Sequence, residues 1–333
     1  MEKIRNIGFD MTKAFAIYLV LVGHCIQYLS SSDYRDDNLW IFIYSFHMPL
    51  FMLVAGYFSA SSYKLDFKSL IVKKTKQLII PMLFWSILIF LAIQFFRQLT
   101  HKPILPFVEL FVTFATCFWF LKSLFICYVM LFLILKLKYK KTLFLWGGVM
   151  MLIFSQFVSI WNVNTMFPCF LAGYIIRTKD NWLQYIKNNW FICFLFFVVL
   201  ELFYSRYIYQ LPEIVSIPTF VEFVSKRIYR IVTGIIASLF WLGLFLSLFA
   251  GKMDNKIVNK IASIGQNTLG IYLIQTLILE KICANIICLA SFDILIRNIL
   301  IIPVLSLILL LLCDSLVRML GKNKIVSRLL LGK

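Results

Sequence analysis

The stretch GFDMTKAFAIYLVLVGHCIQ, residues 8–27, decides the fold class, because it is an apolar segment that also carries Asp10, Lys13 and His24. Its length is enough for a helix to cross the ~30 Å hydrocarbon layer of a bilayer. Charged or titratable groups inside a bilayer are costly unless they are paired or hydrated. The segment therefore predicts a transmembrane helix whose three polar residues need a structural or functional reason.

The rest of the chain repeats this apolar pattern. Its 333 residues are 62% hydrophobic and 14% charged, which is more apolar than a soluble domain requires. The apolar runs are too long and too unalternating for the strands of a barrel. We expect an all-α, polytopic transmembrane helical bundle of about ten helices, forming a single integral-membrane domain over residues 1–333. The expected spans are 10–30, 39–60, 78–97, 115–135, 143–161, 164–177, 189–206, 228–250, 262–281 and 296–317.

The net charge of +18 is mainly an orientation signal. Of the 33 lysines and arginines, 23 lie at the termini and in alternate connections, whereas 9 lie in the other connections and the adjoining helix ends. Cytoplasmic loops of membrane proteins carry such a basic excess. The pattern predicts that both termini are cytoplasmic and that the basic surface meets anionic lipid rather than nucleic acid.

Helical geometry places the polar residues of the first span on one stripe. At 100° per residue, Lys13 and His24 differ by about 20° in direction and lie roughly 16 Å apart along the axis. Asp10 lies about 60° from Lys13, and Tyr28 lies about 40° from His24. Asp10 and Lys13 are expected near the cytoplasmic boundary and His24 beyond the midplane. The structural alternative is that Asp10 and Lys13 form an interfacial ion pair and that His24 only packs helices together.

A second intramembrane histidine, His47, lies in IYSFHMPLFMLVAGYFSA (residues 43–60), two residues before Pro49. A proline cannot donate a backbone hydrogen bond, so a kink or a local opening is expected there. His47 would lie at about the depth of His24, because the two helices run in opposite directions from a short outer loop. The two histidines therefore predict a site in the outer half of the membrane.

Four further residues are candidates with equally good structural explanations. Lys122 lies in the aromatic run CFWFLKSLFICY, where snorkelling to the headgroups is the alternative. Glu201 lies near the outer end of its span and is a candidate for the same cavity. Lys73 and Lys76 lie three residues apart in the most basic inner loop, on a helix face suited to phosphates, although orientation alone also explains them. The eight cysteines are scattered, so no metal site is expected.

Several stretches, taken in order, resemble the motifs of the membrane-bound acyltransferase 3 family, in the branch that contains sugar and exopolysaccharide O-acetyltransferases. They are FDMTKAFAIYLVLVGH, IYSFHMPLFMLVAGYF, KKTKQLIIP, CFWFLKSL, FLAGYIIR and IGQNTLGIYLIQT. Lysine stands at position 13, where the family usually has arginine, and Lys73 and Lys76 replace a pair of arginines. Gln275 stands where a histidine often closes the last motif, so no catalytic role is expected for it.

The resemblance implies transfer of an acyl group, most often acetyl from cytoplasmic acetyl-CoA, to a hydroxyl of a cell-surface or exported polysaccharide or of a glycolipid. It implies that His24 deprotonates the acceptor or carries the acyl group, while His47 orients the site or polarises the thioester. Asp10 and Lys13 would hold the helix or the donor. The expected location is the bacterial plasma (inner) membrane.

The remaining expectations also depend on this resemblance. Lys73 and Lys76 would bind the phosphates of acyl-CoA, and the further candidates for the cavity are Tyr28, Trp119, Lys122 and Glu201. Acetyl-CoA is expected as a substrate, a glycan or lipid-linked sugar as the acceptor, and no permanently bound cofactor or metal is expected. Succinyl transfer and an amine acceptor stay open. A transporter or flippase with an intramembrane relay and a structural subunit of an export assembly are the rival classes.

Overall fold

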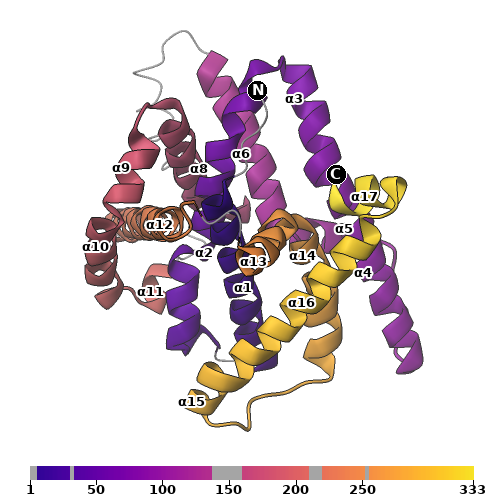
Figure 1. Cartoon of the computed structure of the whole chain (residues 1–333). Helices are drawn as coiled ribbons and strands as arrows, with labels where there is room; N and C mark the ends of the chain where they lie inside the picture. Colours follow the sequence, from indigo (N-terminus) through magenta and orange to yellow (C-terminus); the bar gives the residue numbers. More distant parts are fainter. Residues whose placement is uncertain (1–5, 31–33, 137–159, 210–219, 252–254) are drawn as a thin grey trace.

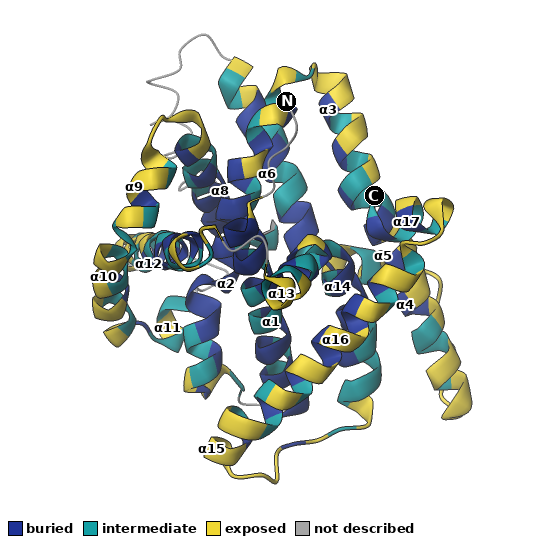
Figure 2. Ribbon diagram, viewed as in Figure 1, coloured by how far each residue is buried: buried dark blue, intermediate teal, exposed yellow. Residues whose placement is uncertain are grey.

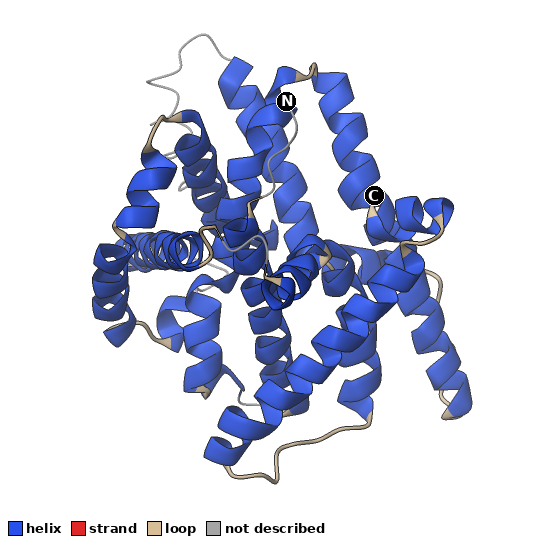
Figure 3. Cartoon of the chain, viewed as in Figure 1, coloured by secondary structure: helices blue, strands red, loops and turns tan. Residues whose placement is uncertain are grey.

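The computed structural model describes residues 6–30, 34–136, 160–209, 220–251 and 255–333, and within these ranges the chain forms helices joined by loops, with no strand (Figure 3). The all-helical prediction is therefore confirmed for this part of the chain. The helices are α1 (Ile7–Leu29), α2 (Asn38–Ser59), α3 (Phe67–Lys74), α4 (Ile80–Leu99), α5 (Val108–Thr116), α6 (Trp119–Lys136), α8 (Val163–Thr178), α9 (Trp182–Asn188), α10 (Trp190–Leu202), α11 (Arg206–Tyr209), α12 (Phe220–Leu248), α13 (Lys256–Gln266), α14 (Thr268–Gln275), α15 (Ile294–Ile296), α16 (Ile302–Leu320) and α17 (Lys324–Leu331).

Several of these helices are long and apolar enough to cross a membrane. Among the described residues there are six such segments, or seven if α9 and α10, which meet at a bend of 70°, form one span. The architecture is that of a multi-pass membrane protein. The predicted count of ten is not confirmed, and the predicted span 143–161 lies, apart from its last two residues, outside the described part.

Helices α1 and α2 run through the middle of the molecule and are its most buried elements (Figures 1 and 2). Asn6 begins α1 by accepting a hydrogen bond of 3.0 Å from the backbone amide of Gly8. Asp37 begins α2 in the same way, accepting from the amides of Leu39 and Trp40. Helices α12, α13 and α16 contact α1, while α8 and α12 contact α2. The two helices that carry the predicted histidines are thus enclosed by others.

The contact between α2 and α8 is close enough for the two backbones to touch. A Cβ atom on Gly56 would lie 1.8 Å from the carbonyl oxygen of Phe170, and one on Gly173 would lie 1.9 Å from that of Leu53. Small residues allow such close packing between membrane helices. The α2 helix also continues without a break through Pro49. His47 is therefore held on a helix whose position is fixed by backbone contact.

Two predicted spans differ from the structure in ways that affect the site. The predicted span 262–281 is divided, because α13 ends at Gln266 and α14 begins at Thr268, and a π-helical segment, Thr276–Ile282, follows. At the break, Asn267 donates a hydrogen bond of 2.8 Å to Asp314 of α16. The predicted span 228–250 begins too late, since α12 already starts at Phe220. The first turns of α12 therefore carry polar side chains into the bundle.

Candidate active site

Three cavities follow α1 from one end to the other. The histidine cavity, of about 690 Å³, is lined by both His24 and His47. The apolar cavity, of about 250 Å³, is lined mainly by aliphatic and aromatic side chains such as Ile17 and Phe120. The basic cavity, of about 1280 Å³, includes Lys64, Arg177 and Lys187 among its lining residues.

The cavities adjoin one another through shared wall residues. Lys13 lines both the basic and the apolar cavity, and Val20, Met48 and Tyr272 line both the apolar and the histidine cavity. Lys13, Val20 and His24 are seven and four residues apart, so they share one face of α1. The stripe that helical geometry predicted is the face of α1 that borders all three cavities, with Lys13 and His24 far apart along it.

His24 is held on one side by two acceptors. Its Nδ1 lies 3.0 Å from Oε1 of Gln275 and 3.4 Å from Oε1 of Glu280. The amide of Gln275 is oriented by its Nε2, which donates to the hydroxyl of Thr276 at 3.1 Å. Since both partners of Nδ1 are acceptors, Nδ1 carries the proton and the neutral imidazole keeps its lone pair on Nε2. His24 is therefore in the tautomer that a general base needs.

His47 has the same tautomer for a different reason. Its Nδ1 lies 2.7 Å from the carbonyl oxygen of Ile43, one turn earlier in α2. A carbonyl only accepts, so Nδ1 donates and Nε2 is left as an acceptor. The ring also meets Tyr44 edge to face, with centroids 4.6 Å apart. A neutral His47 in this state accepts a proton or a hydrogen bond, but it does not polarise a thioester carbonyl.

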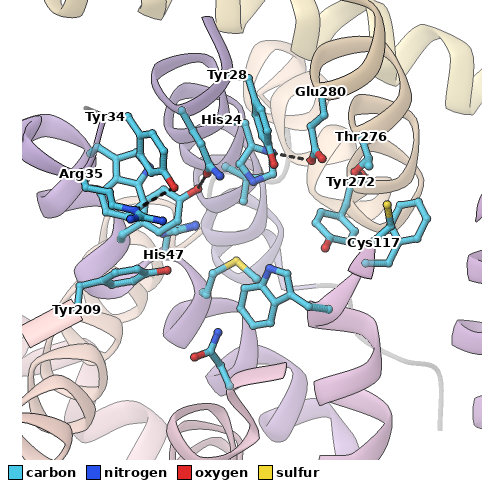
Figure 4. Close-up of a pocket in the computed structure, with 18 of the residues that line it drawn as sticks. His24, Tyr28, Tyr34, Arg35, His47, Cys117, Tyr209, Tyr272, Thr276 and Glu280 are labelled. Carbon is cyan, nitrogen blue, oxygen red and sulfur yellow. Dashed lines mark hydrogen bonds and ion pairs between the residues drawn. The ribbon is translucent and has the colours of Figure 1, made fainter. Parts of the chain in front are cut away.

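Side chains from five regions of the sequence converge on the histidine cavity. Figure 4 shows His24, Tyr28 and Glu280 close together on one side, with Arg35, His47 and Tyr209 on another. The described residues that line it are Val20, His24, Gln27, Tyr28, Tyr34, Arg35, Trp40, Tyr44, His47, Met48, Thr116, Cys117, Phe118, Trp119, Asn162, Tyr209, Arg227, Arg230, Tyr272, Thr276, Glu280 and Lys281. Tyr28 and Trp119, two sequence candidates, are among them.

Two arginines of α12 were not singled out from the sequence. Arg227 and Arg230 are 4% and 6% exposed, and both line the histidine cavity. The charge count includes both among the outer charges, because Arg227 lies just before the expected span 228–250 and Arg230 lies at its outer end. Their spacing of three residues, which gives one helix face, was the available signal. No pattern in a single sequence pairs Glu280 or Gln275 with His24, and Gln275 is the residue for which the family resemblance predicts no catalytic role.

Lys122 and Glu201 do not line any of the three cavities. The Nζ of Lys122 donates to the carbonyl of Phe114 and, at 2.8 Å each, to those of Ala115 and Cys117. These carbonyls lie where α5 ends, so Lys122 caps that helix rather than facing a substrate. Glu201 lies on α10, which packs against α12. The predicted cavity positions of these two residues are therefore corrected.

Asp10 and Lys13 form an ion pair of 2.8 Å at the other end of α1. Asp10 is also bound by Nε2 of Gln266, at 3.1 Å, and both Asp10 and Lys13 border the basic cavity. A carboxylate held by a cation and an amide is well stabilised when partly buried. The pair therefore fixes the Lys13 ammonium at the junction of the basic and apolar cavities.

Lys73 and Lys76 are exposed and line none of the three cavities. Lys74, between them, is buried, with its ammonium 3.7 Å from the centre of the Tyr128 ring and 3.3 Å from Oε1 of Gln77. The helix changes from α-helical to π-helical geometry at Thr75, between Lys73 and Lys76. The side chains of these two lysines therefore point in different relative directions than they would on a regular α-helix.

Among the described residues, no three His, Cys, Asp or Glu side chains lie close enough together to hold a metal ion. The described residues of the histidine cavity supply two imidazoles, a carboxylate, arginines and hydroxyl groups. A family model described as "Acyltransferase domain" matches residues 6–318. The chain belongs to the acyltransferase 3 family. Every residue that lines the histidine cavity lies inside the family match.

Two curated relatives share part of this sequence, and both are called nodulation protein NolL. The protein from Mesorhizobium japonicum is 34% identical over 137 residues, which cover 38% of this chain and 35% of the relative. The protein from Sinorhizobium fredii is 41% identical over 92 residues, 26% of this chain and 24% of the relative. The chain thus spans about a third or less of these relatives' length. No solved structure matches it.

Proposed function

We propose that this member of the acyltransferase 3 family is a membrane O-acyltransferase that moves an acetyl group from acetyl-CoA to a hydroxyl of a polysaccharide or glycolipid sugar. Family membership supports the reaction class. The observation that carries the proposal is the arrangement of His24, whose Nδ1 is held by Gln275 and Glu280 inside a cavity of about 690 Å³. A base oriented by a third group is the arrangement that activates a hydroxyl nucleophile.

The transfer balances without a further reactant. Nε2 of His24 accepts the proton of the sugar hydroxyl as the new carbon–oxygen bond forms at the acetyl carbonyl carbon. The carbon–sulfur bond then breaks, and the CoA thiolate leaves with the proton that His24 holds. Glu280, 3.4 Å from Nδ1, stabilises the imidazolium between these two events. The products are the acetylated sugar, free CoA thiol and neutral His24.

His24 is a better base than His47, because their Nδ1 partners differ. A carboxylate stabilises the positive charge that His24 acquires, whereas His47 is backed by the neutral carbonyl of Ile43. With its lone pair on Nε2, His47 instead accepts a hydrogen bond from the incoming sugar and orients it. The family resemblance implies that His47 either orients the site or polarises the thioester. The tautomer of His47 favours the first of these roles.

The donor occupies the basic and apolar cavities in this proposal. Lys64, Arg177 and Lys187 supply cations for the phosphates of CoA, and Lys13 stands where the basic cavity meets the apolar one. The apolar cavity receives the CoA arm, so that the thioester reaches the shared wall at Val20 and Tyr272. The residues of the basic cavity come from helix ends that the charge count assigns to the cytoplasm. The proposed location is therefore the bacterial inner membrane, with the donor on the cytoplasmic side.

The deciding experiment uses the purified chain in detergent with radiolabelled acetyl-CoA and a sugar acceptor. CoA thiol release and label transfer to the sugar are measured for the wild type, His24→Ala and His101→Asn. We expect His24→Ala to reduce transfer about a hundredfold or more. His101 is exposed, lies outside all three cavities and has a positive φ that asparagine tolerates, so it is the matched histidine control.

Undiminished label transfer by His24→Ala would remove the catalytic assignment. A transporter or flippase, the rival predicted from the sequence, would leave the sugar unmodified and release no CoA thiol in the wild type. Succinyl-CoA, supplied in parallel, separates the two acyl groups, because only the preferred donor will give a low KM. Mass spectrometry of the product then identifies both the acyl group and the acceptor position.

A further inference from the structure

Among its described lining residues, the histidine cavity carries more positive than negative side chains. Four of its lining residues are cationic, namely Arg35, Arg227, Arg230 and Lys281, whereas Glu280 is the one carboxylate among the described lining residues. Glu280 is already engaged by Nδ1 of His24. Arg227 and Arg230 are buried, and a cavity wall of low dielectric strengthens the field of such cations. The cavity therefore attracts an anion.

Arg230 is the most informative of these cations. Its side chain is 6% exposed, and its Nη1 donates to the carbonyl of Tyr209 at 3.3 Å, while the guanidinium lies 4.3 Å from the centre of the Tyr209 ring. No carboxylate among the described residues lies within ion-pair distance of it. A guanidinium has five N–H donors, and a buried cation is costly without a counter-charge. The remaining donors are available to a ligand that brings a negative charge.

The wall beside Arg230 suits a sugar ring. Trp40 and Tyr44 stack with their ring centres 3.9 Å apart, and Tyr209 meets both rings edge to face. Aromatic side chains with a polar group offer both a flat apolar face and a hydrogen bond, which matches the two kinds of surface on a pyranose. A cavity of about 690 Å³ is also within the usual size of small-ligand sites.

We infer that the acceptor is an anionic sugar, one that bears a carboxylate or a phosphate, and that Arg230 binds this charge together with Arg35 while a hydroxyl of the sugar meets His24. This inference rests on the proposed acyl transfer. The phosphates of the donor do not account for the charge, because the basic cavity, beyond the apolar one, already provides a separate set of cations. Two cationic sites at opposite ends of the path correspond to two anionic substrates.

The test compares sugars that differ in charge. Equilibrium binding to the purified protein in detergent, without acetyl-CoA, is measured for methyl glucuronide, glucose 6-phosphate and methyl glucoside. We expect at least one charged sugar to bind about tenfold or more tightly than methyl glucoside. Whichever of the two charged sugars binds more tightly indicates whether the anion on the acceptor is a carboxylate or a phosphate.

Arg230→Gln should remove this preference and leave the weak binding of methyl glucoside unchanged, whereas Arg230→Lys should keep part of it, because lysine retains the charge but not the guanidinium fork. Arg328→Gln is the arginine control and should leave sugar affinity as in the wild type, because Arg328 is exposed on α17 and lines none of the three cavities. Thermal unfolding of each variant verifies that it is folded. Equal affinity for charged and neutral sugars in the wild type, or an unchanged preference in Arg230→Gln, would overturn the inference.

Failure of the inference and failure of the proposed function give different results. If neutral sugars bind and are acetylated as well as charged ones, acyl transfer stands and the anionic acceptor does not. If the charged sugar binds through Arg230 but no CoA thiol is released by the wild type, the binding site stands and the transferase proposal fails, and with it the role of this sugar as an acceptor.

Discussion

The side chains of His24 and Gln275 meet across 251 positions of the sequence, with Nδ1 of His24 3.0 Å from Oε1 of Gln275. Gln275 is fully buried, and its amide is oriented by Thr276. Because an amide oxygen only accepts, this contact holds the His24 proton on Nδ1. Gln275 was expected to have no role in catalysis, since it stands where a histidine often occurs in the family. In the proposed transfer, Gln275 is therefore a positioning residue for His24.

Gln275→Leu tests this positioning role. Leucine is of similar size but leaves Nδ1 with Glu280 as its remaining acceptor, so the imidazole is less firmly oriented. We expect kcat for acetyl transfer to fall about tenfold, with little change in KM for acetyl-CoA. Gln275→His, the residue often found in the family, should retain more activity than leucine, because a ring nitrogen can accept from Nδ1. Equal losses in both variants would indicate a packing role instead.

Glu280→Gln tests the carboxylate behind His24. The substitution keeps the size of the side chain but removes the charge that stabilises imidazolium. We expect kcat to fall about a hundredfold. A smaller loss than in His24→Ala would show that His24 still accepts a proton without the carboxylate. Glu222→Gln is the control, because Glu222 is exposed and pairs with Lys226 on the surface at 2.5 Å. A Glu280→Gln enzyme with wild-type kcat would exclude the carboxylate from the transfer.

Lys122→Met separates capping from substrate binding. Methionine cannot donate to the carbonyls of Phe114, Ala115 and Cys117 at the end of α5. Leaving these part-buried carbonyls without a donor should destabilise the protein by about 1–3 kcal/mol. Thermal unfolding in detergent measures this, with the exposed Lys136→Met as the control. Lost transfer in a variant of unchanged stability would instead support the cavity role predicted from the sequence.

Two sets of basic residues are candidates for binding the CoA phosphates. Arg177→Gln should raise KM for acetyl-CoA about tenfold, because it removes a cation from the basic cavity. Lys73→Gln and Lys76→Gln test the assignment made from the sequence, and we expect smaller changes from these exposed side chains. KM measured at low and high salt checks that each effect is electrostatic. A larger increase for the lysine variants would move the donor's phosphates to α3.

The parts of the site that were predictable depend on one helix at a time. The common face of Lys13 and His24 follows from helical periodicity, which the sequence contains in full. The prediction that His47 and His24 face one site follows from the short loop that joins two antiparallel spans, and both histidines line the same cavity. The all-helical class follows equally from the length of the apolar runs.

The parts that were not predictable depend on which helices meet. Glu280 and Gln275 reach His24 because α14 and the π-helical segment after it pack beside α1. Arg230 faces the cavity because α12 begins at Phe220, earlier than its apolar content indicated. Lys122 satisfies carbonyls only because α5 ends in a turn beside it. Polar residues in a membrane protein select partners in three dimensions, and a single sequence does not record that choice.

The face of α1 that borders all three cavities has a mechanical consequence. A helix with an unbroken hydrogen-bond ladder moves as a rod, so a displacement of Lys13 by a bound donor is transmitted along the axis to His24, about 16 Å away. The backbone contact between α2 and α8 resists such a movement at His47, because His47 lies on α2. The spacing of the two imidazoles would then vary with donor occupancy, and the acceptor would meet a differently shaped site before and after CoA arrives.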